Sequence, residues 1–228
     1  MNIFIATTKM TEKDCTLLFK SAYENRYTWE SNFLGYEGSC SWTDGEREVK
    51  GSFSIGQDLK AIVNEIKDEE IHNAISSQLW EVAIHRVRRS FDQTHGKNTF
   101  TLGDTNEMGS EILVGGKNKG DKYRVRNNVV TMVQRHIHGN LIIILTKDVI
   151  QTGNGYLSKS YSSQYLDPIS KKDLKGTSFY EDNFVPLFNG GPWVLSSRSI
   201  HQESLEGSIT NKQIFSFSEL KSLDSNLD

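Results

Sequence analysis

Two segments of the chain place apolar residues at helical spacing. In residues 11–29, TEKDCTLLFKSAYENRYTW, Leu18 and Ala22 are four positions apart, and Thr11 with Asp14 comes close to a capping box. In residues 67–91, an apolar stripe from Ile71 to Val82 is widened by further apolar residues as far as Phe91. Three acidic residues stand at the start of this segment and three arginines near its end, which suits the helix dipole. The pattern predicts an N-terminal helix and a second helix, near 69–91, inserted between strands.

Nearly all other segments alternate apolar and polar residues over short runs that end at turn residues. Roughly a dozen such runs are present, among them REVKGSFSIG, KYRVRN, LIIILTKDVI and SITNKQIFSFSEL. The connections are of hairpin length, which favours an antiparallel meander over a parallel sheet. We therefore expect an α+β fold, mainly β, with one many-stranded antiparallel sheet. No repeat or linker divides the chain, so we expect one domain over residues 1–228.

The stretch RHIHGN places two histidines two positions apart, and the hairpins on either side of it predict the sheet face to which each side chain points. Asn127-Asn128 and Gly139-Asn140 read as two-residue turns, because these residue types tolerate positive φ. In that register Arg126 faces Val129 and Tyr123 faces Met132, while His138 faces Leu141 and His136 faces Ile143. His136 and His138 then share an uncharged face with Tyr123 and Met132, and we expect that face to be the buried, concave one.

Three interpretations of this histidine pair remain open: hydrogen-bonded core residues, polar contacts in a ligand pocket, or metal ligands. A His-x-His pair on a strand can chelate a metal because both rings project to the same side. The chain has no HExxH motif and no cysteine pair to supply a third ligand. We therefore expect no tightly bound metal, and no cofactor.

The second predicted helix carries further candidates. Glu81, His85 and Arg89 recur every four positions, so they share a helix face, and Trp80 stands beside them. A histidine flanked by arginine can hold an anion or a carboxylate; the alternative is an ordinary solvated face with ion pairs. Phosphate loops, dinucleotide fingerprints and GxSxG motifs are missing from the sequence, so we name no catalytic residue.

Composition narrows the function classes. The net charge is −3, from 26 basic and 29 acidic residues, and such a chain lacks the basic field that nucleic-acid binding needs. Two cysteines without a pairing pattern suit a reducing compartment. The N-terminus MNIFIATTKM reads as neither a signal peptide nor a spanning helix, and no run is long enough for membrane insertion. We expect a cytoplasmic protein.

Several stretches together resemble an uncharacterised family of cyanobacteria and chloroplasts, a domain of unknown function of about this length. The stretches are SAYENRYTW, QLWEVAIHRVRRSF, HGKNTF, GDKYRVRNN, RHIHG and GYLSKSYSSQYLDP. The resemblance covers most of the chain, roughly Asp14 to Ser218, and implies a photosynthetic source. More loosely, the order of elements is similar to lipoprotein-carrier half-barrels, which implies a curved sheet holding an apolar ligand under a helical lid.

The favoured hypothesis is a binding or carrier protein for a small apolar or amphipathic ligand, such as a lipid, pigment or isoprenoid. The predicted contacts are His136, His138, Tyr123 and Met132 from the sheet, with Trp80, His85 and Arg89 from the helix. One alternative is an enzyme that uses His136 or His138 in acid–base or metal chemistry. Another is an assembly factor that binds protein through an exposed patch and holds no ligand.

Overall fold

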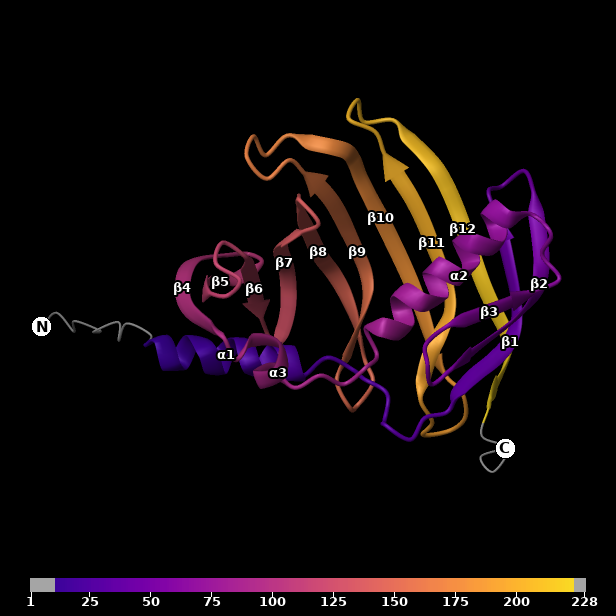
Figure 1. Ribbon diagram of the computed structural model, residues 1–228, viewed down its shortest axis with the longest axis horizontal. Helices are drawn as coiled ribbons and strands as arrows, with labels where there is room; N and C mark the ends of the chain where they lie inside the picture. Colours follow the sequence, from indigo (N-terminus) through magenta and orange to yellow (C-terminus); the bar gives the residue numbers. More distant parts are fainter. Residues whose placement is uncertain (1–10, 224–228) are drawn as a thin grey trace, which may run out of the picture.

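A computed structural model describes residues 11–223, and within them the chain forms three helices and twelve strands (Figure 1). The helices are α1 (Glu12–Glu24), α2 (Glu69–Ile84) and α3 (Phe91–His95). The strands are β1 (Gly35–Thr43), β2 (Glu48–Gly56), β3 (Ala61–Asn64), β4 (Asn98–Asn106), β5 (Gly109–Gly116), β6 (Lys122–Arg126), β7 (Val129–Ile137), β8 (Asn140–Gln151), β9 (Tyr156–Leu166), β10 (Asp173–Pro186), β11 (Trp193–Glu203) and β12 (Ile209–Ser222). The first ten residues, where the sequence predicts neither a signal peptide nor a spanning helix, lie outside this range.

All twelve of these strands belong to one antiparallel sheet, in the order β3-β2-β1-β12-β11-β10-β9-β8-β7-β6-β5-β4. Strands β4 to β12 form a meander, and β1 joins the sheet at the far side by pairing with β12. The sheet does not close, because β3 and β4 are its two edges. The predicted fold class, mainly β with one open antiparallel sheet and two principal helices, is therefore confirmed.

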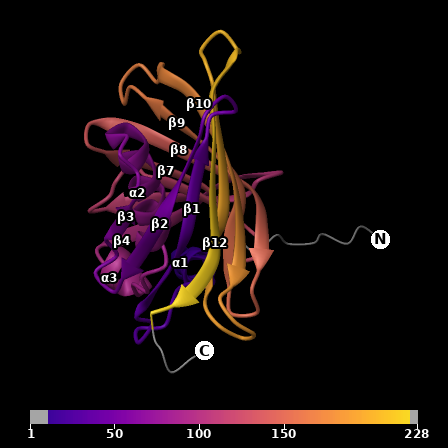
Figure 2. The same cartoon turned by 90° about the vertical axis from the view of Figure 1, so that its right-hand side faces the viewer.

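The helices lie on one face of the sheet, which we call the inner face (Figure 2). Helix α1 begins with the predicted capping box, in which Thr11 and Asp14 cap each other's backbone N–H groups. Its buried residues, with those of α3, pack on β4 to β7 to form an aromatic core. The members of this α1 core are Cys15, Phe19, Ala22, Tyr23, Phe91, Phe100, Ile112, Val114, Tyr123, Val125 and Val130.

Helix α2 crosses the other half of the inner face and buries its apolar stripe there. Asp68 caps its N-terminus by accepting from the backbone of Glu70 and Ile71. The α2 core that results includes Ile71, Ile75, Leu79, Val82, Ala83, Trp42, Phe53, Ile55, Leu157, Leu195, Phe215 and Phe217.

The prediction that this helix extends to residue 91 was wrong, because α2 ends at Ile84. Just past its end, the carbonyl of Arg86 accepts from the backbone N–H of Trp29 at 2.8 Å. The side chain of Arg86 donates to the carbonyl of Tyr27 at 3.1 Å. Contacts with residues 27–29 therefore replace the hydrogen bonds that a longer helix would need. Arg89, predicted to share a helix face with Glu81 and His85, lies outside the helix.

The hairpin register predicted for β6, β7 and β8 was wrong in two places. The Asn127-Asn128 turn is confirmed, with φ of 52° and 60° and Arg126 opposite Val129. A bulge in β7 then shifts the pairing, so that Tyr123 faces Val133 instead of Met132.

The second error lies in the next turn. It is formed by His138 and Gly139, both at positive φ, rather than by Gly139 and Asn140. His136 consequently pairs with Leu141 instead of Ile143. The bulge, a shift of one residue, separates Tyr123, which faces α1, from Met132 and His136, which point to the outer face. The second shift is of two residues, so it changes the partners across β7 and β8 but not the faces.

Candidate ligand-binding face

Between the two cores, the inner face carries a strip of apolar side chains that no helix covers within residues 11–223. Register places Ile144 beside Val133 and Ile142 beside Tyr165, on the face that Tyr123 shares. Four half-buried residues of this strip belong to neither core: Ile137, Ile142, Ile144 and Tyr165. We call these four residues the open strip. They come from the middle strands β7, β8 and β9, which lie between α1 and α2 in Figure 1.

A buried ion-pair network borders the open strip on the α2 side. Arg198, 2% exposed, donates through Nε and Nη2 to the two carboxylate oxygens of Asp182, each at 2.7 Å. It also donates to Tyr161 Oη at 2.7 Å and to Gln78 Oε1 on α2 at 2.8 Å. The Tyr161 ring stacks on Tyr180, with centroids 4.6 Å apart. The network fixes α2 to the sheet, and its donors are used within the protein.

A second set of positive charges lies beyond the C-terminal end of α2 and, unlike Arg198, has no carboxylate partner. Arg86 is 9% exposed, and its Nη1 donates to the Tyr27 carbonyl. The guanidinium carbon lies 5.5 Å from the centre of the Phe184 ring, and Nε has no hydrogen-bond partner. Burial lowers the pKa of Arg86 to about 10, so it stays protonated at neutral pH. A buried guanidinium without a counter-ion is costly, which makes this position unusual.

Two more arginines near Arg86 are also without an ion pair. The Arg26 side chain donates from Nε to the Tyr23 carbonyl at 2.9 Å and lies over the Tyr23 ring. The backbone of Arg26 forms a parallel β-bridge with Tyr156 at the start of β9. Arg89 is exposed. Among residues 11–223, no carboxylate oxygen lies within 4 Å of a side-chain nitrogen of Arg26, Arg86 or Arg89.

His85 stands among these arginines as the C-cap of α2. Solvent reaches its ring, but protein surrounds it on most sides, and this partial burial is the main cause that lowers its pKa to about 4. Four arginine charges lower that pKa further: Arg86, Arg26, Arg198 and Arg89. The imidazole is therefore neutral at pH 7, and its surroundings are strongly cationic. We call His85, Arg26, Arg86 and Arg89 the cationic cluster.

The other predicted contacts are scattered. Tyr123 lies in the α1 core, 4.3 Å from Phe19 between ring centres. Met132 is buried but points to the outer face, and Trp80 is 51% exposed on α2. His136 and His138 are exposed, so the prediction that both point to the buried side was wrong. Of the seven predicted site residues, His85 and Arg89 are linked electrostatically, because the charge of Arg89 contributes to the lowered pKa of His85. Whether any of the seven contacts a ligand stays a prediction.

His136 has one feature that acid–base chemistry would use. Its Nδ1 lies 3.2 Å from Oδ1 of Asp121, which is 4% exposed and also accepts from the His136 backbone N–H. A carboxylate that orients a histidine is one part of a catalytic base. Within the described part of the chain, however, no hydroxyl or thiol is hydrogen bonded to the other ring nitrogen. The enzyme hypothesis has an oriented histidine without a nucleophile beside it.

Neither cysteine is an activated thiol. Cys15 lies in the α1 core and Cys40 in the α2 core, and burial raises the pKa of each to about 11. Within residues 11–223, no three side chains among His, Cys, Asp and Glu gather as metal ligands would. In the same range, every helix is too short or too polar to cross a membrane.

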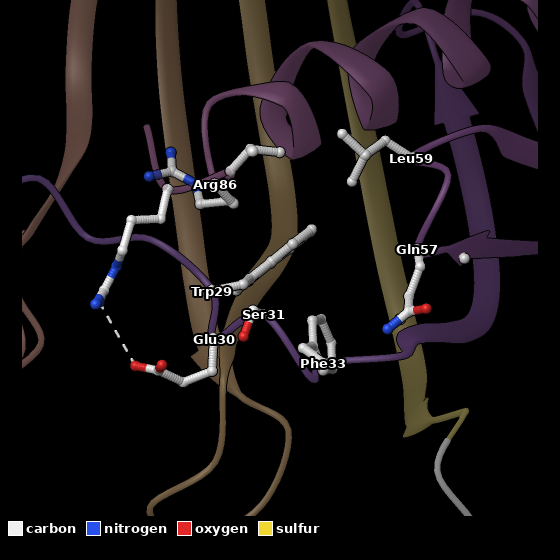
Figure 3. Close-up of a pocket in the computed structure, with 11 residues that line it drawn as sticks. Trp29, Glu30, Ser31, Phe33, Gln57, Leu59 and Arg86 are labelled. Atoms are coloured by element: carbon white, nitrogen blue, oxygen red, sulfur yellow. Dashed lines mark ion pairs between the residues drawn. The ribbon is translucent and has the colours of Figure 1, made fainter. Parts of the chain in front are cut away.

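A groove of about 480 Å3 lies past the end of α2 (Figure 3). Its lining residues are Trp29, Glu30, Ser31, Phe33, Gly35, Gly56, Gln57, Leu59, Arg86, Val87 and Arg88. In Figure 3 the side chains of Leu59 and Gln57 lie opposite those of Trp29 and Phe33. At one edge Arg88 pairs with Glu30, with Nη2 and Oε1 3.5 Å apart. The exposed charges of this groove are therefore matched, in contrast to those of the cationic cluster.

The family model described as "Protein of unknown function (DUF3386)" matches residues 10–223. The chain belongs to this family. Membership confirms the resemblance to a domain of unknown function, and it assigns no activity to the DUF3386 fold. No curated protein matches the chain.

Three solved structures are similar over most of their lengths but at low TM-scores. A domain named as an outer membrane lipoprotein-sorting protein, from Vibrio parahaemolyticus, is 6% identical, covers 94% of each chain and has a TM-score of 0.37. A LolA superfamily protein from Nitrosomonas europaea is 11% identical, covers 92% of this chain and 94% of its own, and scores 0.32. A DUF1329 family protein from Desulfovibrio piger is 9% identical, covers 95% and 93%, and scores 0.24. At these TM-scores the likenesses carry no weight for function.

Proposed function

We propose that this DUF3386 protein is a carrier or accessory protein that holds a small apolar or amphipathic ligand, such as a lipid, pigment or isoprenoid, against its inner face between α1 and α2. The observation that carries the proposal is the open strip. Its three isoleucines and one tyrosine lie on neighbouring strands of the inner face, around Arg135, which pairs with Ile142, and they belong to neither core. Contiguous apolar surface of this kind, framed by polar groups, is what ligand sites require.

The neighbouring side chains also suit a carrier. Tyr161 and Tyr180 stack beside the strip, and the Arg198 network holds their edge in place. Ligand binding here needs no movement of either core, because α1 and α2 are each anchored to a separate half of the sheet. The strip is therefore a preformed surface, and binding to it avoids the entropic cost of ordering a disordered segment.

The proposal is tested with a neutral fluorescent amphiphile, the methyl ester of 11-(dansylamino)undecanoic acid, titrated against the protein. We expect saturable binding by the wild type. Ile144→Lys, which places a charge in the open strip, should weaken binding about tenfold, or 1.4 kcal/mol. Ile143→Lys is the matched control, because Ile143 is the next residue, is also half-buried and points to the outer face.

Two results would contradict a carrier role for the inner face. One is a wild-type protein that does not bind the ester at all. The other is equal loss of binding in Ile144→Lys and Ile143→Lys when both variants have the far-UV circular dichroism spectrum of the wild type. Equal loss would place the bound probe somewhere other than the open strip.

A further inference from the structure

Buried Arg86 poses a specific problem for the free protein. Its charge is removed from water, and its partners within residues 11–223 are one backbone carbonyl and the face of Phe184. Its Nε has no hydrogen-bond partner. The neighbouring carboxylates are engaged elsewhere: Asp182 accepts two hydrogen bonds from Arg198, and Glu30 pairs with Arg88. An anion that reached Arg86 would supply what its guanidinium lacks.

The positive charges around Arg86 also favour binding of an anion. Arg26 and Arg89 also have no ion pair, and Arg86 donates to the carbonyl of Tyr27, the residue after Arg26. The excess is local, because the whole chain is slightly acidic, with a net charge of −3. A cationic site enclosed on several sides by protein focuses its field, which raises the local concentration of anions.

The cationic cluster and the open strip lie along the same strand. Arg26 bridges to Tyr156 at the start of β9, and Ile144 pairs with Ser163 farther along it. The seven residue-to-residue steps from Tyr156 to Ser163 correspond to about 23 Å of extended strand. A chain of fatty-acid length laid along β9 reaches from one feature toward the other.

We propose that the ligand is an anionic amphiphile, with a carboxylate, sulfonate or phosphate head group bound by Arg86, Arg89, Arg26 and His85 and its apolar chain on the open strip. The inference rests on the proposed carrier function and names the ligand class. In this proposal the arginines make the site selective for anionic over neutral amphiphiles, because the apolar open strip alone does not distinguish them.

The test compares two probes that differ only in charge: 11-(dansylamino)undecanoate and its methyl ester. We expect the wild type to bind the acid more tightly than the ester. Arg89→Gln and Arg26→Gln should each weaken binding of the acid about three- to fivefold and leave the ester unchanged, because both arginines are partly solvated. The double variant should lose most of the preference for the acid.

Arg88→Gln is the matched control, because Arg88 neighbours Arg89 but pairs with Glu30. It should leave both affinities unchanged. Arg86→Met removes the central charge and is informative if the variant folds. Arg86→Lys keeps a charge but loses the guanidinium, and should bind the acid between the wild type and Arg86→Met. Should both Arg86 variants fail to fold, Arg89→Gln and Arg26→Gln still decide the matter.

The outcomes separate the two proposals. If the wild type binds acid and ester equally, or if Arg88→Gln weakens the acid as much as Arg89→Gln does, the head-group inference is wrong and the carrier function stands. If neither probe binds, the carrier function itself is wrong. Inorganic phosphate is the third arm: millimolar phosphate that displaces the acid completely would show a site for free anions, which overturns the amphiphile assignment.

Discussion

The two halves of the inner face hold their helices by different interactions. At the α1 end, Phe19 sits among aromatic rings, with Tyr123, His95 and Phe100 at 4.3, 5.0 and 5.2 Å between ring centres. At the α2 end, an aliphatic helix stripe packs on the sheet, and Gln78 and Glu81 of α2 accept from Arg198, which is paired with Asp182 within the sheet. One end is held by ring contacts and the other partly by an ion pair.

This difference explains where uncovered surface remains. At the α1 end aromatic rings pack together, and Arg135, whose Nε lies 3.6 Å from Asp121, pairs with Ile142 of the strip. The α2 end must keep its ionic groups hydrogen bonded, so tyrosines, glutamine and arginine line its edge. The open strip thus has the aromatic core and Arg135 on one side, and tyrosines with the cationic cluster toward the other, and this asymmetry suits an amphiphile.

The largest effect is expected at the α1 end. Phe19→Ala removes the central ring of that core, so the free energy of unfolding should fall by about 4 kcal/mol, the usual cost of a large buried aromatic residue. Urea unfolding measures this loss. Leu17→Ala, at a position 54% exposed two residues earlier, should change stability by less than about 0.5 kcal/mol. Comparable losses in the two variants would show that α1 packs by another face.

The α2 end should respond through charge. Asp182→Ala leaves Arg198 buried without its bidentate partner and should cost about 3 kcal/mol. The cost stays at the low end because Tyr161, Gln78 and the carboxylate of Glu81 still accept from the guanidinium. The double variant Asp182→Leu, Arg198→Met should be more stable than Asp182→Ala, as urea unfolding would reveal. A double variant less stable than the single one would mean that the ion pair contributes beyond charge balance.

The free energy of unfolding should decrease as the pH is lowered below neutral, mainly because of His95 at the α1 end. Burial is the first cause that lowers the pKa of His95 to about 4, and the ring is 5% exposed. In the unfolded chain the pKa is near 6.5, so between pH 6.5 and 4 the unfolded state binds the proton and the folded state does not. Stability is complete above pH 6.5 and should be lower by roughly 2 kcal/mol at pH 5.

His95→Gln should remove most of this pH dependence, measured as the difference in unfolding free energy between pH 7 and pH 5. The depressed pKa of His85 acts in the same direction at the α2 end. Because solvent reaches its ring, His85→Gln should remove less of the dependence than His95→Gln. The reverse order would show that the cationic cluster, rather than the aromatic core, controls the response to acid.

Much of the fold follows from periodicity in the sequence. The number of strands, their antiparallel order and the start of α1 at Thr11 all follow from alternation, turn residues and a capping box. The end of α2 does not, because it is set by hydrogen bonds between Arg86 and residues 27–29, which are distant in sequence. The bulge in β7 is likewise a tertiary feature without a local signal.

The candidate site was less accessible to sequence reasoning. His85 and Arg89 were identified from their spacing, although Arg89 reaches the cluster from a loop rather than from a helix. Arg198 and Asp182 were missed. The sequence did contain a sign of their burial, because each is a charged residue near apolar or aromatic positions of the same strand. Ile200 follows Arg198 by two positions, and Tyr180 and Phe184 flank Asp182. The open strip depends on register, and a shift of one residue exchanges the two faces of a strand.

The smallest predicted effect tests that register directly. His138 occupies the left-handed region at φ 49° as the first residue of the β7–β8 turn, a conformation that asparagine tolerates better than histidine. His138→Asn should therefore stabilise the protein by about 0.5 kcal/mol in urea unfolding. If the turn were Gly139-Asn140, residue 138 would be in the strand, and asparagine there would destabilise it. The same change two residues earlier, His136→Asn, is the control: that side chain is in β7 and contacts Asp121, so it should lower stability. A gain in His138→Asn with a loss in His136→Asn places the turn at residues 138–139, and so pairs Ile142 with Arg135 and Ile144 with Val133.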